Sequence, residues 1–579
     1  MTQATSNLAP LKFLQDRWDA SLAATLDKAD LLRYRSNLLG SDLRITNFAG
    51  GNTSSKIQAI DPATGEPVTV LWVKGSGGDL GSIQRGGFAT LYQRKFLALE
   101  ESYQGIDSED EMVGMYPRCA FAGNPVAASI DTPLHGFLPF AHIDHLHPDW
   151  GIALAASANG KVKMEEFNRE FGHSLVWMPW LRPGFELGLR MRRVVAENPD
   201  CDGIVLGGHG LFTWGETQRE CYLKTLTVID QLGQFIERHR SAKEKITFGG
   251  EVIAARIDRQ ELAIEIAPFL RGRVSTQNRW IASFTDAGDV LRFINSAQAR
   301  ELAFLGTSCP DHFIRTKIRP LFVPWAADEG LIELKAHIDF SLAEYCELYG
   351  SYYHAYATAG SPALRDPNPT VVLIPGLGMF SFGKNKTEAR IVGEFYLNAI
   401  HVMEGATLLD EGPVEGTLPQ CGEGADGAGF KVFSNYVALP AIEAFGIEYW
   451  AMEEAKIRRQ PPEKELSRKI VLVAGDGREV AINAAVRGAH VIIAGNNKET
   501  TDQTVEDLKS VTSREFVGSV TIDINRRVSV TDALRATVKY FGGLDIVIDC
   551  NSQKSPLLAE ESAKLFVEQG LDGSYRDNL

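Results

Sequence analysis

Four histidines fall within thirteen residues of one segment, and metal binding is the chemistry that this clustering suggests. They are His135, His142, His145 and His147, in a chain with 12 histidines. Side chains two residues apart on an extended strand share a face, so His145 and His147 can offer two imidazole nitrogens to one ion, while His142 falls on the other face. Pro148 and Asp149 favour the start of a helix, which would leave the pair at a strand end.

A third histidine would complete a catalytic zinc site, because such a site needs three protein ligands and one open position. His209 is the residue that we predict for this role. It lies between Gly208 and Gly210, where the missing side chains let the backbone come close to an ion. A histidine satisfied by ordinary hydrogen bonds is the alternative for any one of the three imidazoles taken alone.

Two glycine-rich segments have the composition of anion-binding loops. Residues 49–56 read AGGNTSSK and residues 74–81 read KGSGGDLG. Successive backbone N–H groups in such loops can form an anion-binding nest, whereas ordinary glycine turns are the alternative interpretation. Neither segment has the pattern of a Walker A loop or of a dinucleotide-binding turn. The residues predicted to bind phosphate are Gly51, Asn52, Ser54, Gly75, Ser76 and Gly77.

In order and approximate spacing, the motifs GNTSSK, KGSGG, HLH and GGHG resemble the class II aldolase/adducin family. The resemblance implies an α/β/α fold, a zinc ion held by histidines that match His145, His147 and His209, and a site for the phosphate of dihydroxyacetone phosphate in the two loops. The whole chain is similar to the bifunctional rhamnulose-1-phosphate aldolase/alcohol dehydrogenase proteins. The motifs cover about residues 40–240, and they are specific for the fold rather than for the substrate.

Cleavage of a carbon–carbon bond also needs a base, and Asp131 is our prediction for it. Its place in SIDTPLH resembles that of a catalytic glutamate in small members of the family, with His135 four residues on. This chain departs from the family in having the shorter Asp and a shorter interval to the metal pair. A helix cap before Thr132 and Pro133 is the alternative. Asp144 is expected either to orient a ligand imidazole or to lie on the strand surface.

The elements that must position these residues have an α/β pattern. Residues 68–73 and 203–213 read as strands, and residues 86–101 and 217–239 read as helices. We interpret residues 1–245 as a class II aldolase/adducin-like catalytic domain.

Residues 246–455 contain a weak echo of the first domain. The segment PGLGMFSFG at 375–383 matches GGHGLFTWG at 207–215 in four of nine positions, and a helix-like stretch at 387–406 follows it. Duplication of a supersecondary unit and chance similarity are both open. If the unit is duplicated, this second aldolase-like region has Leu377 opposite the third histidine and is non-catalytic.

Residues 306–317 are chemically rich but have no clear site pattern. Cys309 and His312 lie close together there. No third group is placed by spacing, so we interpret them as structural residues.

The remainder of the chain reads as a linker and a dinucleotide-binding fold. Residues 456–469, KIRRQPPEKELSRK, form a charged linker. Residues 470–579 resemble a short-chain dehydrogenase of Rossmann type, with Gly475 and Gly477 as a weak cofactor-binding turn. The turn is short, no acid ends the second strand and no Tyr-x-x-x-Lys pair follows. We therefore expect a truncated, degenerate domain that lacks dehydrogenase activity, does not bind NAD(P) tightly and serves in packing or oligomer contacts.

Composition limits the partners of the chain. Its 579 residues are 44% hydrophobic and 23% charged, and 59 Lys and Arg against 74 Asp and Glu give a net charge of -15. This charge opposes binding to nucleic acid or to anionic membranes. Seven scattered cysteines indicate a reducing compartment, and neither a signal peptide nor a membrane span is visible, so we expect a cytoplasmic protein.

The resemblance implies an aldolase that uses zinc or another divalent metal. Its expected substrate is a ketose 1-phosphate, with rhamnulose 1-phosphate first, and its products are dihydroxyacetone phosphate and lactaldehyde. The expected partners are this sugar phosphate and further copies of the chain in a homo-oligomer. The alternatives are an epimerase or decarboxylase on the same fold, an NAD-dependent dehydrogenase, and a non-catalytic adducin-like scaffold.

Overall fold

The computed structural model describes residues 10–242, 246–326, 328–411, 430–450 and 461–578. The chain divides into two compact units. Unit 1 comprises residues 1–247, 307–311 and 401–444, and unit 2 comprises residues 248–306, 312–400 and 445–579. The predicted mixed α/β class is confirmed in both units.

A seven-stranded sheet forms the centre of unit 1, with the strand order β3-β2-β1-β4-β7-β6-β5. Only β5 and β6 pair in parallel, and the other neighbours are antiparallel. The strands are β1 (Asn52–Ile60), β2 (Pro67–Lys74), β3 (Phe88–Tyr92), β4 (His142–Leu146), β5 (Leu175–Met178), β6 (Gly203–Leu206) and β7 (Gly210–Gly215). The predicted metal pair therefore lies at the end of the central strand β4.

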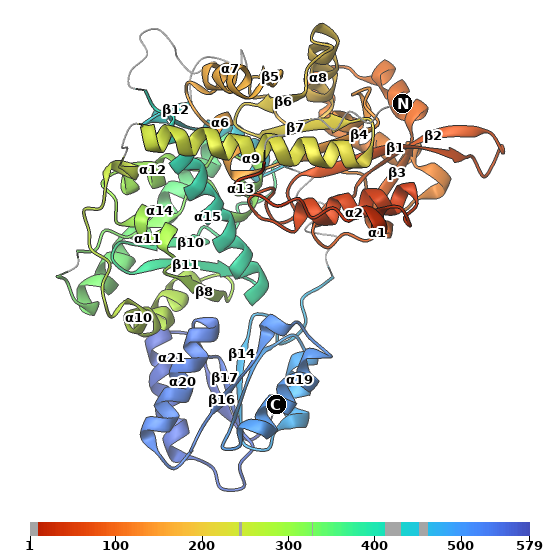
Figure 1. Ribbon diagram of the computed structural model, residues 1–579. Coiled ribbons are helices and arrows are strands. Elements are labelled where there is room, and N and C mark those ends of the chain that lie inside the picture. Colours follow the sequence, from red (N-terminus) through yellow and green to blue (C-terminus); the bar gives the residue numbers. More distant parts are fainter. Residues whose placement is uncertain (1–9, 243–245, 327, 412–429, 451–460, 579) are drawn as a thin grey trace. The chain divides into compact units, whose positions relative to one another are not determined.

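Helices cover this sheet, and the longest of them, α9, packs across β4 and β7 (Figure 1). The helices of this part are α1 (Ala20–Ala23), α2 (Lys28–Gly40), α3 (Gln93–Ala98), α4 (Glu109–Met115), α5 (Thr132–Gly136), α6 (Asp149–Ala155), α7 (Gly160–Phe171), α8 (Phe185–Glu197) and α9 (Gln218–Ala242). A short hairpin of β12 (Lys431–Phe433) and β13 (Tyr436–Ala438) also belongs to unit 1.

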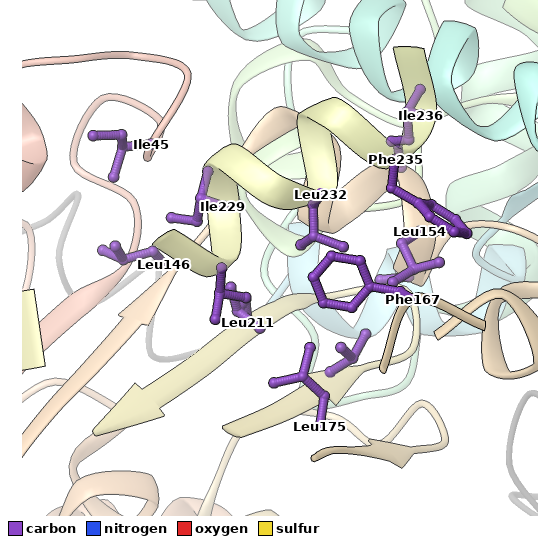
Figure 2. Close-up of a cluster of buried hydrophobic side chains, with 14 of the residues drawn as sticks. Ile45, Leu146, Leu154, Phe167, Leu175, Leu211, Ile229, Leu232, Phe235 and Ile236 are labelled. Atoms are coloured by element: carbon purple, nitrogen blue, oxygen red, sulfur yellow. The ribbon is translucent and has the colours of Figure 1, made fainter. Parts of the chain in front are cut away.

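The main core of unit 1 lies between α9 and the sheet. Ile229 and Leu232 recur at helical spacing on α9 and face Leu146 of β4 and Leu211 of β7 (Figure 2). All four side chains are almost completely buried. Burial of one such side chain contributes about 1.5–3 kcal/mol to folding, so this cluster fixes α9 against the strands that carry the histidines.

Unit 2 contains a four-stranded sheet that repeats part of the sheet of unit 1. Its order β8-β11-β10-β9 has the same pairing directions as β4-β7-β6-β5. Gly208 and Gly376 both have a positive φ in the turns that join the hairpin strands. The strands are β8 (Ile281–Thr285), β9 (Leu321–Phe322), β10 (Val371–Ile374) and β11 (Gly378–Gly383). The sequence echo therefore coincides with a repeated supersecondary unit.

The repeated register assigns a counterpart to each predicted zinc ligand. His145 pairs with Phe212 on β7, and Phe284 pairs with Phe380 on β11. Counting from these pairs, Phe284 and Asp286 stand where unit 1 has His145 and His147, and Leu377 stands opposite His209. The second copy has none of the three imidazoles. The sequence pattern had shown this for Leu377 alone.

The helices that accompany this second sheet are α10 (Arg259–Val274), α11 (Gly288–Ile294), α12 (Ala299–Leu305), α13 (Pro310–Thr316), α14 (Leu331–Tyr356), α15 (Lys386–Leu408) and α16 (Ala441–Glu448). Three of them, α13, α15 and α16, cross a boundary between the two units.

The C-terminal part of unit 2 is a parallel five-stranded sheet with the order β16-β15-β14-β17-β18. Its strands are β14 (Ile470–Ala474), β15 (His490–Gly495), β16 (Val517–Thr521), β17 (Ile546–Asp549) and β18 (Ser574–Arg576), and its helices are α18 (Arg478–Val486), α19 (Lys498–Lys509), α20 (Arg527–Phe541) and α21 (Pro556–Gln569). This is the Rossmann-type arrangement that the sequence predicted. Residues 456–460 of the predicted linker lie outside the described residues.

Most of the expected elements are present. The strand at 68–73 is β2, and the helices at 217–239 and 387–406 are α9 and α15. Residues 203–213 form two strands of a hairpin rather than one strand. The helix predicted for 86–101 is wrong in its first half, because residues 88–92 form the edge strand β3, paired with β2.

Among the described helices, none is both long and apolar enough to cross a bilayer. Six cysteines are free thiols in the described part of the chain, namely Cys119, Cys201, Cys221, Cys309, Cys346 and Cys550. The seventh, Cys421, lies outside the described residues.

Candidate functional site

The three predicted ligands converge at one point in unit 1. His145 and His147 come from the end of β4, and His209 comes from the turn between β6 and β7. Their ring centroids are 4.8 Å apart for His145 and His147, 4.8 Å for His145 and His209, and 5.2 Å for His147 and His209. All three side chains are buried, and one nitrogen from each lies within 4.8 Å of the others.

The spacing of the nitrogens fits a divalent ion. The Nε2 atoms of His145 and His147 are 3.2 Å apart. Two nitrogens that each lie about 2.0–2.1 Å from one tetrahedral zinc ion are separated by roughly 3.3–3.4 Å. The neutral imidazole is the form that binds a metal, and the buried Nδ1 atoms of His145 and His209 have no hydrogen-bond partner among the described residues. These residues therefore fit a three-histidine metal site.

Burial keeps two of the three imidazoles neutral. It holds the pKa of His145 well below its ordinary value, and it lowers the pKa of His209 to about 3, with a further lowering by His147. His147 differs from them. Burial also disfavours its charged form, but the Asp311 carboxylate at its Nδ1 outweighs burial and raises its pKa well above the ordinary value.

Asp131 lies beside this cluster. Its Oδ2 is 3.9 Å from Nδ1 of His145 and accepts a hydrogen bond of 2.5 Å from the Asn52 side chain. Asp131 occupies the N-cap position of α5, but its side chain makes no capping hydrogen bond. The carboxylate thus lies beside the histidines and does not cap α5, which was the alternative interpretation.

The first predicted anion loop borders the histidines directly. Asn52 pairs with His145 across β1 and β4. The Ser54 hydroxyl lies 2.8 Å from Nδ1 of the buried His135, so it is already engaged within the protein. The Lys56 ammonium donates to three carbonyl oxygens and so fixes the segment between α5 and β4. Asn52 is the side chain of this loop that is aimed at the cluster.

The second predicted loop is tied to the first by Lys74. The Lys74 ammonium donates to the carbonyls of Ala49 and Gly78 at 2.8 and 2.7 Å. In the loop itself, Gly75 N–H donates to Gly87 O and Ser76 N–H donates to Ala127 O. Gly77 has a φ of 80°, which gives the loop its tight turn. The two segments predicted separately from the sequence therefore lie together, although two of the backbone donors have partners in the chain.

Asp144 has neither of the roles that the sequence left open. It is fully buried on the opposite face of β4 and forms an ion pair of 3.1 Å with Arg35. It also accepts a hydrogen bond of 2.8 Å from Thr225. Asp144 is therefore a partner of α2 and α9 rather than of a ligand imidazole or of solvent. His142 shares this face, as expected, and bonds the Ser55 hydroxyl at 2.9 Å.

The predicted cofactor turn of the C-terminal sheet is closely covered. Gly475 N–H donates to Ala494 O, and Gly477 N–H donates to Gly475 O. A Cβ atom on Gly475 would lie 2.7 Å from Oδ1 of Asn551. The Asn551 side chain therefore occupies the space directly against this turn.

One group of residues at the histidine cluster was not found from the sequence. The segment 307–311 belongs to unit 1, and Cys309 and Asp311 lie with His147 in a second cluster of ligand-type atoms. The structural interpretation of Cys309 was therefore incomplete. His312, by contrast, bonds Asn398 at 2.6 Å within unit 2. The thiol and the carboxylate in SCPDH could have marked these residues as possible ligands. Their local sequence, however, does not show that they lie near the distant histidines.

Comparison with known proteins gives the family. Residues 33–232 match the class II aldolase and adducin N-terminal domain, residues 261–457 match the second domain of class II aldolases, and residues 469–569 match the short-chain dehydrogenases. A Bacillus subtilis (strain 168) protein, described as the uncharacterized oxidoreductase YuxG, is 34% identical over 542 residues, covering 92% of this chain and 74% of that protein. The chain belongs to the family of fused class II aldolase and short-chain dehydrogenase proteins.

Comparison with solved structures found matches to the first part of this fused aldolase–dehydrogenase chain. The N-terminal class II aldolase domain of a Thermoplasma acidophilum protein is 30% identical, with 38% of this chain and 99% of that chain covered and a TM-score of 0.34. YgbL from Escherichia coli, titled a putative aldolase/epimerase/decarboxylase, is 15% identical, with 36% and 86% covered and a TM-score of 0.25. Membership of the family confirms the resemblance deduced from the motifs and supports an enzymatic role.

Proposed function

We propose that this fused aldolase–dehydrogenase chain is a zinc-dependent aldolase that cleaves a ketose 1-phosphate reversibly, with rhamnulose 1-phosphate as the first substrate to test. The products would be dihydroxyacetone phosphate and lactaldehyde. The observation that carries the proposal is the convergence of three buried imidazoles, two of them held neutral by burial, at the end of the central strand of the class II aldolase sheet. An adducin-like scaffold has no use for such a cluster.

His145, His147 and His209 would hold the ion. When bound, a divalent ion supplies Lewis-acid stabilisation of the enediolate charge that develops as the carbon–carbon bond breaks. No imidazole can bring a negative charge to the site, so the three histidines would leave the charge of the ion available for the substrate oxygens. The stacking of His145 on Phe212, with ring centroids 4.1 Å apart, keeps this imidazole in a fixed orientation.

Asp131 would move the proton. In cleavage it would take the proton of the hydroxyl group on the carbon that becomes the aldehyde, and after the carbon–carbon bond has broken it would give this proton to the enediolate carbon, which yields dihydroxyacetone phosphate; the reverse reaction uses the same two transfers in the opposite order. The Asn52 amide donates to Oδ2 of Asp131 and so fixes the orientation of this carboxylate. Cleavage would therefore depend on Asp131 as proton acceptor and on Asn52 as the group that orients it.

The two glycine-rich loops would receive the phosphate. The predicted residues are Gly51, Asn52, Ser54, Gly75, Ser76 and Gly77. With a net charge of -15, the chain as a whole repels an anion, so capture has to be local. In this proposal Ser54 acts through His135, which it contacts, and the link by Lys74 holds the two loops in one arrangement.

Metal analysis combined with a retro-aldol assay on several ketose 1-phosphates tests the proposal. We expect about one divalent ion per chain and aldehyde release that disappears in the variant His209→Ala. A wild-type protein that is metal-free and inactive, or a His209→Ala variant with full activity, would reject the proposal. His173→Ala is the matched control, because His173 is a histidine of the same unit whose partners are Gln231 and Asp202.

Product analysis in the same assay separates the related reactions. The epimerase and the decarboxylase are the alternatives on the same fold. Release of an aldehyde supports the aldolase, an isomeric sugar phosphate of the same mass supports the epimerase, and release of carbon dioxide supports the decarboxylase. All three outcomes use the same histidines, so only the products distinguish them.

We further propose a division of labour along the chain. Residues 1–245 would be the catalytic domain, residues 246–455 a non-catalytic aldolase-like region, residues 456–469 a linker, and residues 470–579 a short-chain-dehydrogenase-like domain without catalysis. The absence of histidine at Phe284, Asp286 and Leu377 supports the second assignment. Assembly into a homo-oligomer and residence in the cytoplasm belong to the same proposal, and light scattering of the purified chain tests the oligomer.

A further inference from the structure

A short segment far from the histidines in sequence reaches the metal site. Residues 307–311 lie within unit 1, between two stretches of chain that belong to unit 2. Within this segment Asp311 is the second residue of α13, and Cys309 is completely buried. The segment enters unit 1 only for these five residues, so its contacts there need an explanation.

Asp311 contacts one atom of one ligand. Its Oδ2 forms a hydrogen-bonded ion pair with Nδ1 of His147. The two ring nitrogens of an imidazole point in divergent directions, so a hydrogen bond at Nδ1 fixes where Nε2 points. In His147, Nε2 lies 3.2 Å from Nε2 of His145, toward the centre of the histidine cluster. Asp311 thus fixes the ring in the orientation that binding of an ion requires.

The other two ligands have no comparable support. Nδ1 of His145 and Nδ1 of His209 lack a hydrogen-bond partner among the described residues. Asp131 approaches His145 only to 3.9 Å. Asp311 is therefore matched to His147 specifically and is not one member of a general acidic lining.

The first anion loop is shaped around the same carboxylate. A Cβ atom on Gly50 would lie 2.3 Å from Oδ2 of Asp311 and 3.3 Å from Nδ1 of His147. Real Cβ atoms do not approach other atoms so closely, so only glycine leaves room for Asp311 at this position. The loop, the carboxylate and the imidazole therefore form one packed contact.

Cys309 supports the segment from the other side. Its Sγ donates a hydrogen bond of 3.5 Å to the carbonyl oxygen of His209. This bond engages the thiol with the backbone of the turn that carries His209. The geometry thus favours Cys309 as a packing residue behind His209 rather than as a fourth ligand.

We propose that Asp311 is the positioning residue of the metal centre, holding His147 by Nδ1 so that Nε2 faces the ion, and that the second aldolase-like region supplies it to the catalytic domain. This inference rests on the proposed metal site. Carboxylates that accept a hydrogen bond from a ligand imidazole fix its tautomer and raise its basicity, and their loss typically lowers metal affinity by about 10–100-fold.

Metal affinity measured by competition with a chromophoric chelator tests the inference on the full chain. With Co²⁺, we expect Asp311→Ala to lose about 10–100-fold in affinity and Asp311→Asn to lose less, because the amide oxygen still accepts from Nδ1–H. Gly50→Ala should also weaken binding, because the new methyl group displaces the carboxylate. Asp202→Ala removes a different Asp–His pair of unit 1 and should change nothing. Equal thermal unfolding midpoints show that a variant is folded.

The outcomes separate the two proposals. If wild type binds Co²⁺ and His209→Ala does not, but Asp311→Ala binds within twofold of wild type, the positioning role is wrong and the metal site stands. If wild type binds no divalent ion, both fail. A thiolate-to-cobalt charge-transfer band that Cys309→Ser abolishes would make Cys309 a ligand and would also overturn the assignment. With the inference correct, proton NMR of the Co²⁺ protein should show a shifted, slowly exchanging Nδ1–H signal that disappears in Asp311→Ala.

Discussion

Replacing Asp144 with asparagine should destabilise the aldolase domain without weakening its metal site. Asp144 stands next to His145 in the sequence, but it lies on the opposite face of β4, where it pairs with Arg35. Both side chains are fully buried. Breaking such a pair by removing one charge costs about 3–5 kcal/mol, because the other charge stays buried.

The surroundings of Arg35 favour the lower end of that range. Arg35 keeps three other acceptors, which are the Gln218 side chain at 2.6 Å, the Ser54 carbonyl at 2.7 Å and the Ile143 carbonyl at 3.4 Å. Asparagine also keeps an oxygen that can accept from Thr225. We therefore expect a loss of about 3 kcal/mol for Asp144→Asn, which corresponds to a fall of roughly 6–12 °C in the unfolding midpoint of a domain of this size.

Scanning calorimetry and Co²⁺ competition on the same samples measure the two effects separately. Glu100→Gln is the matched control, because Glu100 forms an exposed ion pair with Arg192, and exposed pairs contribute about 0–1 kcal/mol. If Asp144→Asn lowers the midpoint no more than this control does, the buried pair is not the support that the structure indicates. If the folded variant binds Co²⁺ much more weakly, Asp144 acts on the ligands and the separation of the two faces is wrong.

Three further predictions concern unit 2. Burial lowers the pKa of His490 to about 3, so between pH 6.5 and pH 3 this residue binds a proton more readily in the unfolded chain than in the folded chain. Denaturant unfolding should therefore show about 2 kcal/mol less stability at pH 5 than at pH 7 from this residue. The variant His490→Gln should remove this difference, and a difference that persists in the variant would contradict the prediction. Asp545→Asn breaks its buried pair with Arg271, 2.8 Å long, and should cost about 3–5 kcal/mol by calorimetry, whereas an unchanged midpoint would refute the role of the pair. Quenching of NAD(H) fluorescence should show no tight binding, because Asn551 lies against the turn at Gly475, and saturation at micromolar cofactor would disprove this.

The convergence of the three histidines could be predicted in part because the H-x-H pattern is local. Side chains alternate along any strand, so the H-x-H spacing at His145 and His147 already assigned both imidazoles to one face. The glycines around His209 indicated a close approach of the backbone to an ion, but the turn between β6 and β7 was not predicted, because residues 203–213 read as one strand. The expectation of one continuous helix at 86–101 failed because residues 88–92 form hydrogen bonds with β2, a pairing partner that local composition does not reveal.

For the second aldolase-like region, sequence similarity alone could not establish the repeat. The echo between residues 207–215 and 375–383 was short enough to be chance. The common strand order and register decide the matter in favour of a repeated unit, and they extend the comparison to Phe284 and Asp286, which the alignment of nine residues did not reach.

The sequence by itself determined the fold class, the family and the residues that would bind a metal, since each depends on motifs whose geometry is set by a few neighbouring residues. Only the tertiary structure decided the partners of those residues. Asp311 lies 164 positions from His147, and Asp144, one position from His145, lies on the other face of its strand. Separation along the chain does not predict which side chains are in contact in either case. The pleat of a strand places adjacent side chains on opposite faces of the sheet, whereas packing brings remote segments into hydrogen-bonding contact.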